Sequence, residues 1–329
     1  MTHSLKAPQC ETIYFAGTTT DILVPAARSD GAFSLLRIVT PPGGRTPPHL
    51  HRNEDETVLV LSGSIRVEEE AGQVDLSPGL ALTLPRGQAH RLSNVGSVEA
   101  EALVLCTPGG FDGFVRSAGR PAQADDPATT EADIDRLVRA APQYGIELLG
   151  DDVLSEAALH PAAAPASPET LDVFGVSMQF LAELGANDDD VSLMRGQLPP
   201  GGVVMLHSHA DPELLYVVTG AVDVSLGPVG AATWRTIEPG QCVAIQDAAP
   251  HALRNRGNTP VDMVLVSTRR MALFLREIAR PPAEVPLGPP SEARLLAFAV
   301  AAQTRHYWLG DRSENEAIGM VMEPPTLQR

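Results

Sequence analysis

The sequence predicts an all-β fold of two tandem barrels, each built from short antiparallel strands and flanked by short helices. Short strand-like segments, separated by turns that contain glycine and proline, recur along most of the chain. One set of three histidines and one glutamate occurs twice, and His207 follows His49 by 158 residues. Because 329 residues also suit two domains, we expect one barrel domain in residues 1–157 and another in residues 158–329.

The strands of the first barrel are expected where apolar or alternating runs lie between turn residues. Many short strands of this kind are typical of antiparallel barrels. We expect the second barrel to span residues 172–267 in the same way. The expected strands of the first barrel are Ile13–Phe15, Thr20–Val24, Phe33–Thr40, Glu56–Leu61, Ile65–Glu69, Gly72–Leu76, Leu80–Leu84, His90–Asn94 and Glu99–Cys106.

Helical spacing is expected in the segments that follow each barrel. Phe111 and Phe114 lie three residues apart, which suits one face of a short helical turn. Segment 158–168, rich in proline and alanine, is expected to be a linker. The expected longer helices are Glu131–Ala141, with Thr129 or Thr130 as N-cap, Arg269–Ile278, and Glu292–Trp308, with Ser291 as N-cap.

The first half of the chain holds a set of candidate metal ligands. His49 and His51 share one face of a strand, because side chains alternate between the two faces. Glu56 opens the next strand after a short turn, and His90 opens a strand that follows a Pro/Gly turn. Since only the first two share a strand, a closed or rolled sheet is needed to bring all four together. Three imidazoles and a carboxylate suit a divalent transition metal: iron, manganese, nickel, copper or zinc.

The second half repeats this set as His207, His209, Glu213 and His251, with a turn before the glutamate that is one residue shorter. We therefore expect one divalent transition metal in each barrel, and the pattern leaves its identity open. The remaining histidines lack partners at useful spacing: His3 and His160, expected to be solvated, and His306, expected on a helix face.

Further residues at fixed distances complete two motifs in the first half: Gly43, Gly63, Gly79, Pro85, Gly87 and Asn94. Together with the four candidate ligands, they resemble the two signature motifs of the cupin superfamily. The chain thus resembles a bicupin over nearly all its length, which implies two jelly-roll barrels, also called double-stranded β-helices. The second half matches the first motif but has Gln246 and Ala248 in place of the proline and glycine of the second, so its turn geometry is open.

Within the bicupins, the first half is similar to the quercetin 2,3-dioxygenase-like group. The similarity lies in Pro47–Glu56, Pro85–His90 and Thr107–Phe114. It implies that the three histidines and the glutamate of each set hold the metal. It also implies that the glutamate acts as a base toward a substrate hydroxyl, so Glu56 and Glu213 are candidate catalytic residues.

Composition restricts the partners of the protein. The net charge is −17, from 41 acidic and 24 basic residues, which argues against nucleic acid and against an anionic membrane surface. The three cysteines lie far apart and form no Cys-x-x-Cys pair, which favours a reducing, cytoplasmic location. Neither a signal peptide nor an apolar run long enough to span a membrane is visible, so no membrane association is expected.

Strand parity predicts mostly apolar pocket walls, which suit a neutral or aromatic organic substrate. The expected wall residues are Val58, Val60 and Leu92 in the first barrel, and Val203, Met205, Leu215, Val217 and Leu253 in the second.

These observations favour a metal-dependent dioxygenase that acts on a small aromatic or enolisable hydroxylated organic substrate, with dioxygen as the other reactant. Two alternatives stay open: a non-oxygenase bicupin, such as an oxalate decarboxylase-like enzyme or an isomerase, and a metal-dependent small-molecule-binding protein. Arg45 lies four residues before His49, and the intervening Thr-Pro-Pro differs from the first motif of oxalate decarboxylases. We expect either a monomer whose two barrels pair or a homodimer.

Overall fold

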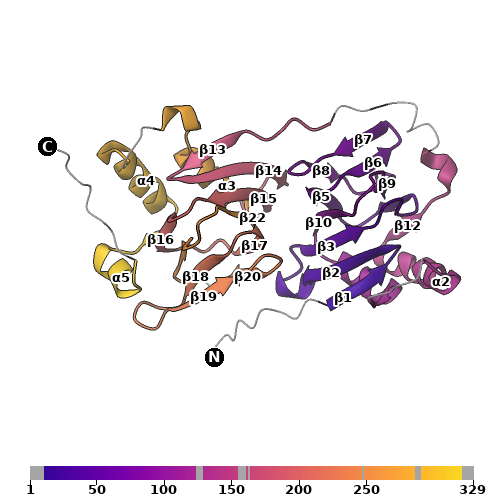
Figure 1. Ribbon diagram of the computed structural model, residues 1–329, viewed down its shortest axis with the longest axis horizontal. Helices are drawn as coiled ribbons and strands as arrows, with labels where there is room; N and C mark the ends of the chain where they lie inside the picture. The colour runs from indigo at the N-terminus through magenta and orange to yellow at the C-terminus, as the bar shows by residue number, and fades with distance from the viewer. Residues whose placement is uncertain are drawn as a thin grey trace. The chain divides into compact units, whose positions relative to one another are not determined.

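A computed structural model describes residues 11–123, 129–154, 161, 164–246, 248–285 and 290–320. The chain divides into two compact units between Ser167 and Pro168. Both units are built mainly from antiparallel strands (Figure 1), which confirms the predicted all-β fold of two tandem barrels. The border predicted at residues 157–158 lies outside the described residues. Within the described ranges, no helix has the length and apolar character needed to cross a membrane.

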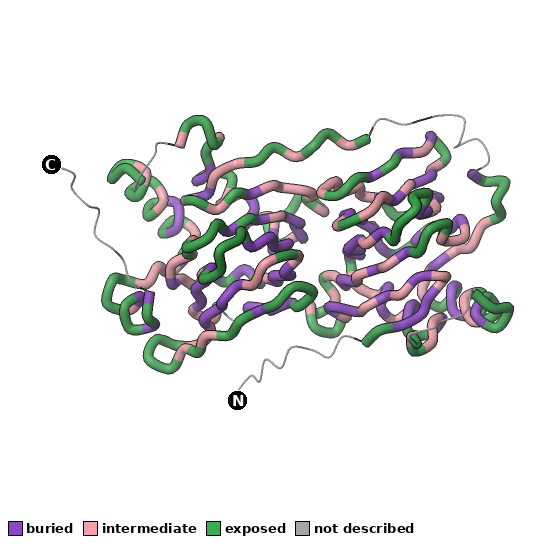
Figure 2. Tube along the Cα trace, in the orientation of Figure 1, coloured by how far each residue is buried: buried purple, intermediate pink, exposed green. Residues whose placement is uncertain are grey.

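The N-terminal unit is formed by short strands in two antiparallel sheets. The strands are β1 (Glu11–Phe15), β2 (Thr18–Val24), β3 (Ser34–Thr40), β4 (His49–His51), β5 (Asp55–Ser62), β6 (Ile65–Glu69), β7 (Gly72–Leu76), β8 (Ala81–Leu84), β9 (His90–Ser93), β10 (Ala100–Thr107), β11 (Arg120–Pro121) and β12 (Ile146–Leu148). One sheet has the order β11-β1-β2-β3-β10-β5-β8 and the other β12-β4-β9-β6-β7. Apolar side chains from both sheets, such as Val58 and Ile65, are fully buried in one core. Figure 2 shows buried residues along the strands of each unit. Burial of each such side chain contributes about 1.5–3 kcal/mol to folding.

Two helices follow the first barrel, α1 (Phe111–Ala118) and α2 (Glu131–Ala140). Phe111 and Phe114 of α1 contact the ring of Phe15, with centroids 6.0 and 5.3 Å away, so the predicted helical turn adds aromatic rings to the barrel core. Helix α2 begins at the predicted residue and ends one residue early. Thr130 is its N-cap and forms a capping box with Asp133.

The C-terminal unit repeats this plan. Its elements are β13 (Thr170–Val173), β14 (Val176–Leu184), β15 (Val191–Leu198), β16 (Val203–Ser208), β17 (Glu213–Thr219), β18 (Val222–Leu226), β19 (Thr233–Ile237), β20 (Cys242–Ile245), β21 (His251–Arg254), β22 (Val261–Thr268), α3 (Arg269–Ile278), α4 (Glu292–Thr304), β23 (Trp308–Leu309) and α5 (Arg312–Ala317). The sheets have the orders β13-β14-β15-β22-β17-β20 and β19-β18-β21-β16-β23. Strand β16 therefore corresponds to β4, β17 to β5, β21 to β9 and β23 to β12.

The prediction for the last helix is wrong at its C-terminal end. Helix α4 begins at Glu292, capped by Ser291 as predicted, but it ends at Thr304. His306 has a φ of 58°, a left-handed conformation that a helix cannot continue through, so this histidine is not on a helix face. The chain then turns into β23, where Trp308 pairs with Ser208 of β16.

The prediction of which β16 side chains face the pocket is also wrong. The pairing of β16 with β21 shifts register between Val204 and His207, which marks a β-bulge or irregularity. As a result Val203 is 45% exposed, Met205 packs on a small outer cluster, and Val204 packs on the main core instead. The bulge adds one residue to β16, and the side chains before it therefore point to the opposite face of the sheet. The other predicted wall residues of the second barrel lie in the core: Leu215, Val217 and Leu253.

The asparagine that ends the second motif has the same structural role in both barrels. Asn94 donates hydrogen bonds from Nδ2 to the carbonyl oxygens of Thr40 and Val98, and its Oδ1 accepts one from the Gly96 amide. Asn255 makes the corresponding bonds to Leu198, Thr259 and Gly257. Each asparagine thus holds the turn after the strand that begins at His90 or His251.

The turn before that strand has a left-handed residue in both barrels, and this predicts opposite effects of two exchanges. Gly87 has a φ of 80° and Ala248 a φ of 50°. A Cβ added to Gly87 would meet no atom within 4 Å, so Gly87→Ala should cost the left-handed strain of about 1–2 kcal/mol, of which about 0.5–1 kcal/mol is offset by the lower chain entropy of alanine in the unfolded state. Ala248→Gly should relieve the same strain, but the higher chain entropy of glycine in the unfolded state offsets about 0.5–1 kcal/mol of this gain. Denaturant unfolding of both variants tests this, and destabilisation by Ala248→Gly as large as that by Gly87→Ala would contradict it.

Candidate metal centres

The first candidate centre is assembled from three strands and two sheets. His49 and His51 lie on β4, and His90 lies directly opposite His49 where β9 pairs with β4. Glu56 reaches the group from β5 in the facing sheet. One ligand atom from each of the four lies within 4.8 Å of the others, and all four residues are buried. The structure therefore brings together the four residues that the sequence pattern singled out in this half.

The ring orientations fit a bound cation. The Nδ1 atoms of His49 and His90 hydrogen-bond the carbonyl oxygens of Pro47 and Gln88, both at 2.9 Å, which leaves each Nε2 free to act as a ligand. Glu56 Oε2 lies 3.2 Å from His51 Nε2 and 3.1 Å from His90 Nε2. His51 Nε2 is buried without a well-formed hydrogen bond among the described residues. Because such atoms are costly unless paired, a metal ion that accepts their lone pairs suits this donor set.

The electrostatics favour the ligand protonation state at His49 and Glu56 and favour a bound proton at His51. Burial, together with the rings of His90 and His51, lowers the pKa of His49 to about 3, so this imidazole is neutral. Burial raises the pKa of Glu56, but the hydrogen bond with His90 and the contact with His51 outweigh this and hold the pKa well below the usual value. Burial lowers the pKa of His51, but the nearby carboxylates of Glu54 and Glu56, 3.6 and 3.2 Å from its ring nitrogens, raise it to about 9. A metal ion that binds His51 would have to displace this proton.

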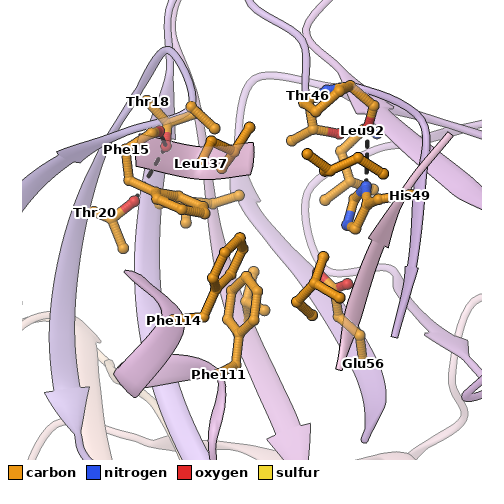
Figure 3. Close-up of a pocket in the computed structure, with 16 residues that line it drawn as sticks. Phe15, Thr18, Thr20, Thr46, His49, Glu56, Leu92, Phe111, Phe114 and Leu137 are labelled. Atoms are coloured by element: carbon orange, nitrogen blue, oxygen red, sulfur yellow. Dashed lines mark hydrogen bonds between the residues drawn. The ribbon is translucent and has the colours of Figure 1, made fainter. Parts of the chain in front are cut away.

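A cavity of about 50 Å³ adjoins this cluster. His49 and Glu56 face it from one side, and Phe15, Phe111 and Phe114 lie across from them (Figure 3). Thr18, Thr20 and Thr46 supply the other polar side chains, and no lysine or arginine is among the lining residues. The remaining wall is apolar: Ala16, Ile38, Pro47, Leu92, Val104, Leu137, Ile146 and Leu148.

The second centre gathers three histidines. Ligand nitrogens of His207, His209 and His251 lie within 4.8 Å of one another. Their Nδ1 atoms hydrogen-bond the carbonyl oxygens of Met205, Asp211 and Ala249 at 2.8–2.9 Å, so all three Nε2 atoms are free for a ligand role. The Nε2 atoms of His209 and His251 are buried without a hydrogen bond among the described residues, which again fits a cation.

Glu213 joins this second cluster less closely than Glu56 joins the first. Its carboxylate oxygens lie 3.3 Å from His209 Nε2 and 3.4 Å from His251 Nε2. It is not part of the group within 4.8 Å that includes His207. Burial raises the pKa of Glu213, but the close contacts with His209 and His251 hold it well below the usual value. Each barrel therefore contains a candidate site for a divalent metal, and the ligand role of Glu213 stays a prediction.

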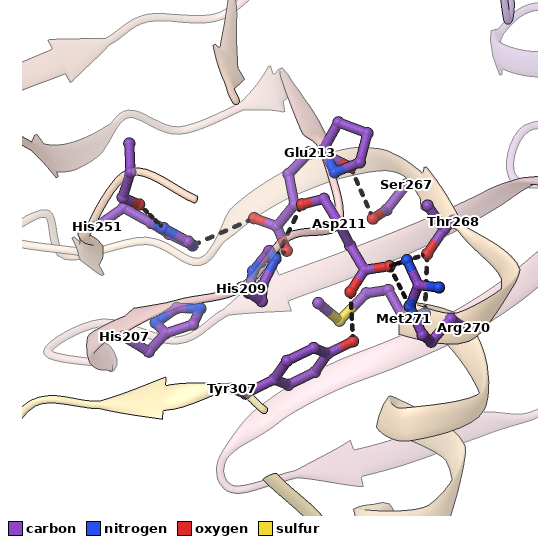
Figure 4. A network of polar contacts seen from close by, with 12 residues as sticks. His207, His209, Asp211, Glu213, His251, Ser267, Thr268, Arg270, Met271 and Tyr307 are labelled. Atoms are coloured by element: carbon purple, nitrogen blue, oxygen red, sulfur yellow. Dashed lines mark hydrogen bonds and ion pairs between the residues drawn. The ribbon is translucent and has the colours of Figure 1, made fainter. Parts of the chain in front are cut away.

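A buried polar network beside the second centre was not predicted (Figure 4). The Asp211 carboxylate accepts hydrogen bonds from Thr268 Oγ1 at 2.5 Å, Arg270 Nε at 2.9 Å and Tyr307 Oη at 2.5 Å. Its backbone carbonyl is the group that holds His209. Burial raises the pKa of Tyr307, and the bond to Asp211 raises it further, so the phenol stays protonated as a donor.

Sequence comparison finds cupin domains and several distant relatives. The cupin domain family matches residues 36–106 and 194–267. The chain is 30% identical over 92 residues to the tetracenomycin polyketide synthase protein TcmJ of Streptomyces glaucescens, an alignment that covers 28% of this chain and 62% of TcmJ. It is 27% identical over 100 residues to quercetin 2,3-dioxygenase of Bacillus subtilis (strain 168), covering 30% of this chain and 29% of that protein. The chain thus spans less than two thirds of the length of these relatives.

Structure comparison finds the same architecture in solved oxalate decarboxylases. The Lactobacillus farciminis enzyme, in a formate complex, superposes with a TM-score of 0.54 at 16% identity over 80% of this chain and 85% of that one. A Bacillus subtilis oxalate decarboxylase whose Mn(II) centres were studied superposes with a TM-score of 0.54 at 14% identity over 97% of this chain and 86% of that one. At these identities the likeness concerns the fold alone. With one match to the cupin domain family in each half, the chain carries two tandem cupin domains, the domain arrangement of a bicupin.

Proposed function

We propose that the N-terminal barrel is a metal-dependent dioxygenase that acts on a small aromatic or enolisable hydroxylated organic substrate. The observation that carries the proposal is the cavity beside His49 and Glu56, whose wall is largely apolar. An apolar pocket with a few polar groups at one end is the usual form of a site for a neutral organic ligand.

The described residues of the cavity wall include no lysine or arginine side chain, and this argues against a charged carboxylate substrate such as oxalate. Burying a carboxylate is costly unless an opposite charge or several donors compensate. The lining residues include three threonines but neither lysine nor arginine, so a metal ion would be the only positive charge there. A hydroxylated neutral molecule needs only one oxygen directed at that ion, while its apolar part contacts Phe111, Phe114 and Leu92.

Glu56 is suited to take the proton of such a hydroxyl group. Its pKa is held well below the usual value despite burial, so it is ionised at neutral pH. Because so low a pKa also makes it a weak base, the transfer requires a substrate hydroxyl whose own pKa falls when the substrate is bound. It lines the cavity and belongs to the ligand cluster at the same time. When bound, a divalent transition metal supplies a Lewis acid and, if it is redox-active, a partner for dioxygen. The apolar wall excludes water from the deprotonated substrate.

The size of the cavity bears on the substrate. About 50 Å³ is well below the roughly 300–1,000 Å³ usual for sites that hold drug-sized ligands. We therefore expect single-ring catechols or short β-diketones to be better substrates than three-ring flavonols. The similarity to quercetin 2,3-dioxygenase over 100 residues supports the reaction class, and it leaves the substrate open.

The proposal is tested by oxygen uptake. Protein loaded separately with iron, manganese, nickel or copper is offered catechols, β-diketones and flavonols in an oxygen electrode, and products are identified by mass spectrometry. We expect substrate-dependent uptake with incorporation of both atoms of labelled dioxygen. The proposal fails if no metal supports uptake, or if oxalate loses carbon dioxide without net consumption of oxygen.

A further inference from the structure

Each barrel carries a second buried acid, two residues before the glutamate of its cluster. Glu54 precedes Glu56, and Asp211 precedes Glu213. These two acids are only 3% and 2% exposed. Glu54 follows His51 by three residues and faces its ring, and Asp211 follows His209 by two residues and contacts its ring through the backbone carbonyl. The repeat therefore allows a direct comparison of two equivalent carboxylates.

The two carboxylates have different surroundings. The Asp211 carboxylate accepts hydrogen bonds from Thr268, Arg270 and Tyr307. It points away from the ring of His209 (Figure 4). Glu54 Oε1 is buried and has no hydrogen-bond partner among the described residues. His51 Nδ1 lies 3.6 Å from it, beyond hydrogen-bond distance.

The repeat explains why Glu54 lacks these donors. Strand β22 ends at Thr268 and β10 at Thr107, so Thr107 takes the place of Thr268, but its Oγ1 is buried without a partner. Counting two residues onward places Gly109 where the second barrel has Arg270. Ile146 pairs with His51 at the position that corresponds to Tyr307. Two donors of the Asp211 network are thus replaced by residues that have no polar side chain.

The histidines of the two clusters differ in a related way. Five of the six hydrogen-bond a backbone carbonyl oxygen through Nδ1: His49, His90, His207, His209 and His251. His51 is the exception, because its Nδ1 faces the Glu54 carboxylate and makes no hydrogen bond to a carbonyl. At 3.6 Å the Glu54 carboxylate lies within ion-pair distance of Nδ1 but beyond hydrogen-bond distance. A carboxylate there adds a negative charge near the cation and makes the inner nitrogen a stronger donor.

We propose that Glu54 is a positioning residue that acts through His51 and makes the N-terminal centre the tighter of the two metal sites. The two centres are then unequal, although their motifs are nearly the same. The inference depends on metal binding at both centres and is independent of the oxygenase reaction proposed above, so either can fail alone.

The affinity of the two sites is measured with Co²⁺ alone. Metal-free protein is titrated against a chromophoric chelator, and the visible spectrum of bound Co²⁺ is recorded. We expect two classes of site whose affinities differ at least about tenfold, as partners of ligating histidines commonly change affinity by about 10–100-fold. His49→Gln should remove the tight class and His207→Gln the weak class, because these two histidines occupy equivalent positions.

Glu54→Gln should weaken the tight class about 10–100-fold and shift its Co²⁺ absorption, with the weak class unchanged. The matched control is Asp55→Asn, the same chemical change one residue away, on a side chain that is 30% exposed and bound to Arg86. This control should change neither class. The inference is overturned if both variants have equal effects or if Glu54→Gln leaves the affinity and the spectrum unchanged. Two sites of equal affinity in the wild-type protein would also overturn it, even where Glu54→Gln does not fold.

Discussion

Glu56→Gln is expected to lower the rate of oxygen uptake by about 10²–10⁴-fold, the usual contribution of a positioned general base. Glutamine keeps the shape of the side chain but cannot take a proton from a substrate hydroxyl. It also withdraws the charge that lies 3.2 and 3.1 Å from His51 and His90, so weaker metal retention should accompany the loss. Steady-state uptake and metal content, measured on the same preparation, separate the two effects.

The matched control for this variant is Glu213→Gln in the second barrel. Glu213 holds the equivalent sequence position, and its pKa is also held low. If the reaction takes place only beside the described cavity, Glu213→Gln should retain at least about half of the activity, a change of less than 0.5 kcal/mol in the barrier. Equal losses in both variants would place the reaction in both barrels, and a loss in Glu213→Gln alone would contradict the assignment to the first.

Asp211→Asn is expected to destabilise the C-terminal barrel by about 2–3 kcal/mol. Breaking a buried ion pair typically costs about 3–5 kcal/mol, and the value is reduced here because Arg270 is about one third exposed. The amide cannot satisfy Thr268, Arg270 and Tyr307 as the carboxylate does, and Thr268 is also the N-cap of α3. For a domain of this size the melting temperature should fall by roughly 4–12 °C.

Differential scanning calorimetry measures this effect, and Asp189→Asn is its control. Asp189 contacts the same guanidinium at 2.9 Å, but its side chain is 82% exposed. Exposed ion pairs contribute little, so this variant should change the unfolding free energy by less than about 1 kcal/mol. Similar shifts in the two variants would mean that the Asp211 network does not stabilise the barrel.

The strands and the two histidine clusters could be predicted because their signals are local. Alternation, glycine turns and fixed motif spacing each extend over only a few residues, and the repeat supplied a second, independent copy. The wall of the second barrel was predicted less well, since the bulge between Val204 and His207 leaves no mark in the residue pattern. The end of α4 was missed for a similar reason: His306 continues the helical spacing but adopts a left-handed backbone.

The polar surroundings of the clusters depend on contacts between distant segments. Tyr307 and Asp211 are 96 residues apart, and no periodicity joins them. The pair Glu54 and Asp211 did have a signal, namely an acid two residues before the ligand glutamate in both halves. Whether such an acid has hydrogen-bond donors depends on residues far away in the sequence. The second barrel has Arg270 and Tyr307 at positions where the first has Gly109 and Ile146, and this correspondence becomes visible only in the fold.

The strands β12 and β23 have a consequence for how this protein can be divided. Each pairs with the strand that carries the two neighbouring histidines, β4 or β16, and each belongs to a segment well beyond the end of the cupin match at residues 106 and 267. A fragment cut at those residues would leave the histidine strand as an open sheet edge, with unpaired amides and carbonyls facing solvent. Open edges recruit strands from other molecules, so such fragments should aggregate, and the smallest autonomous unit is longer than the recognisable domain.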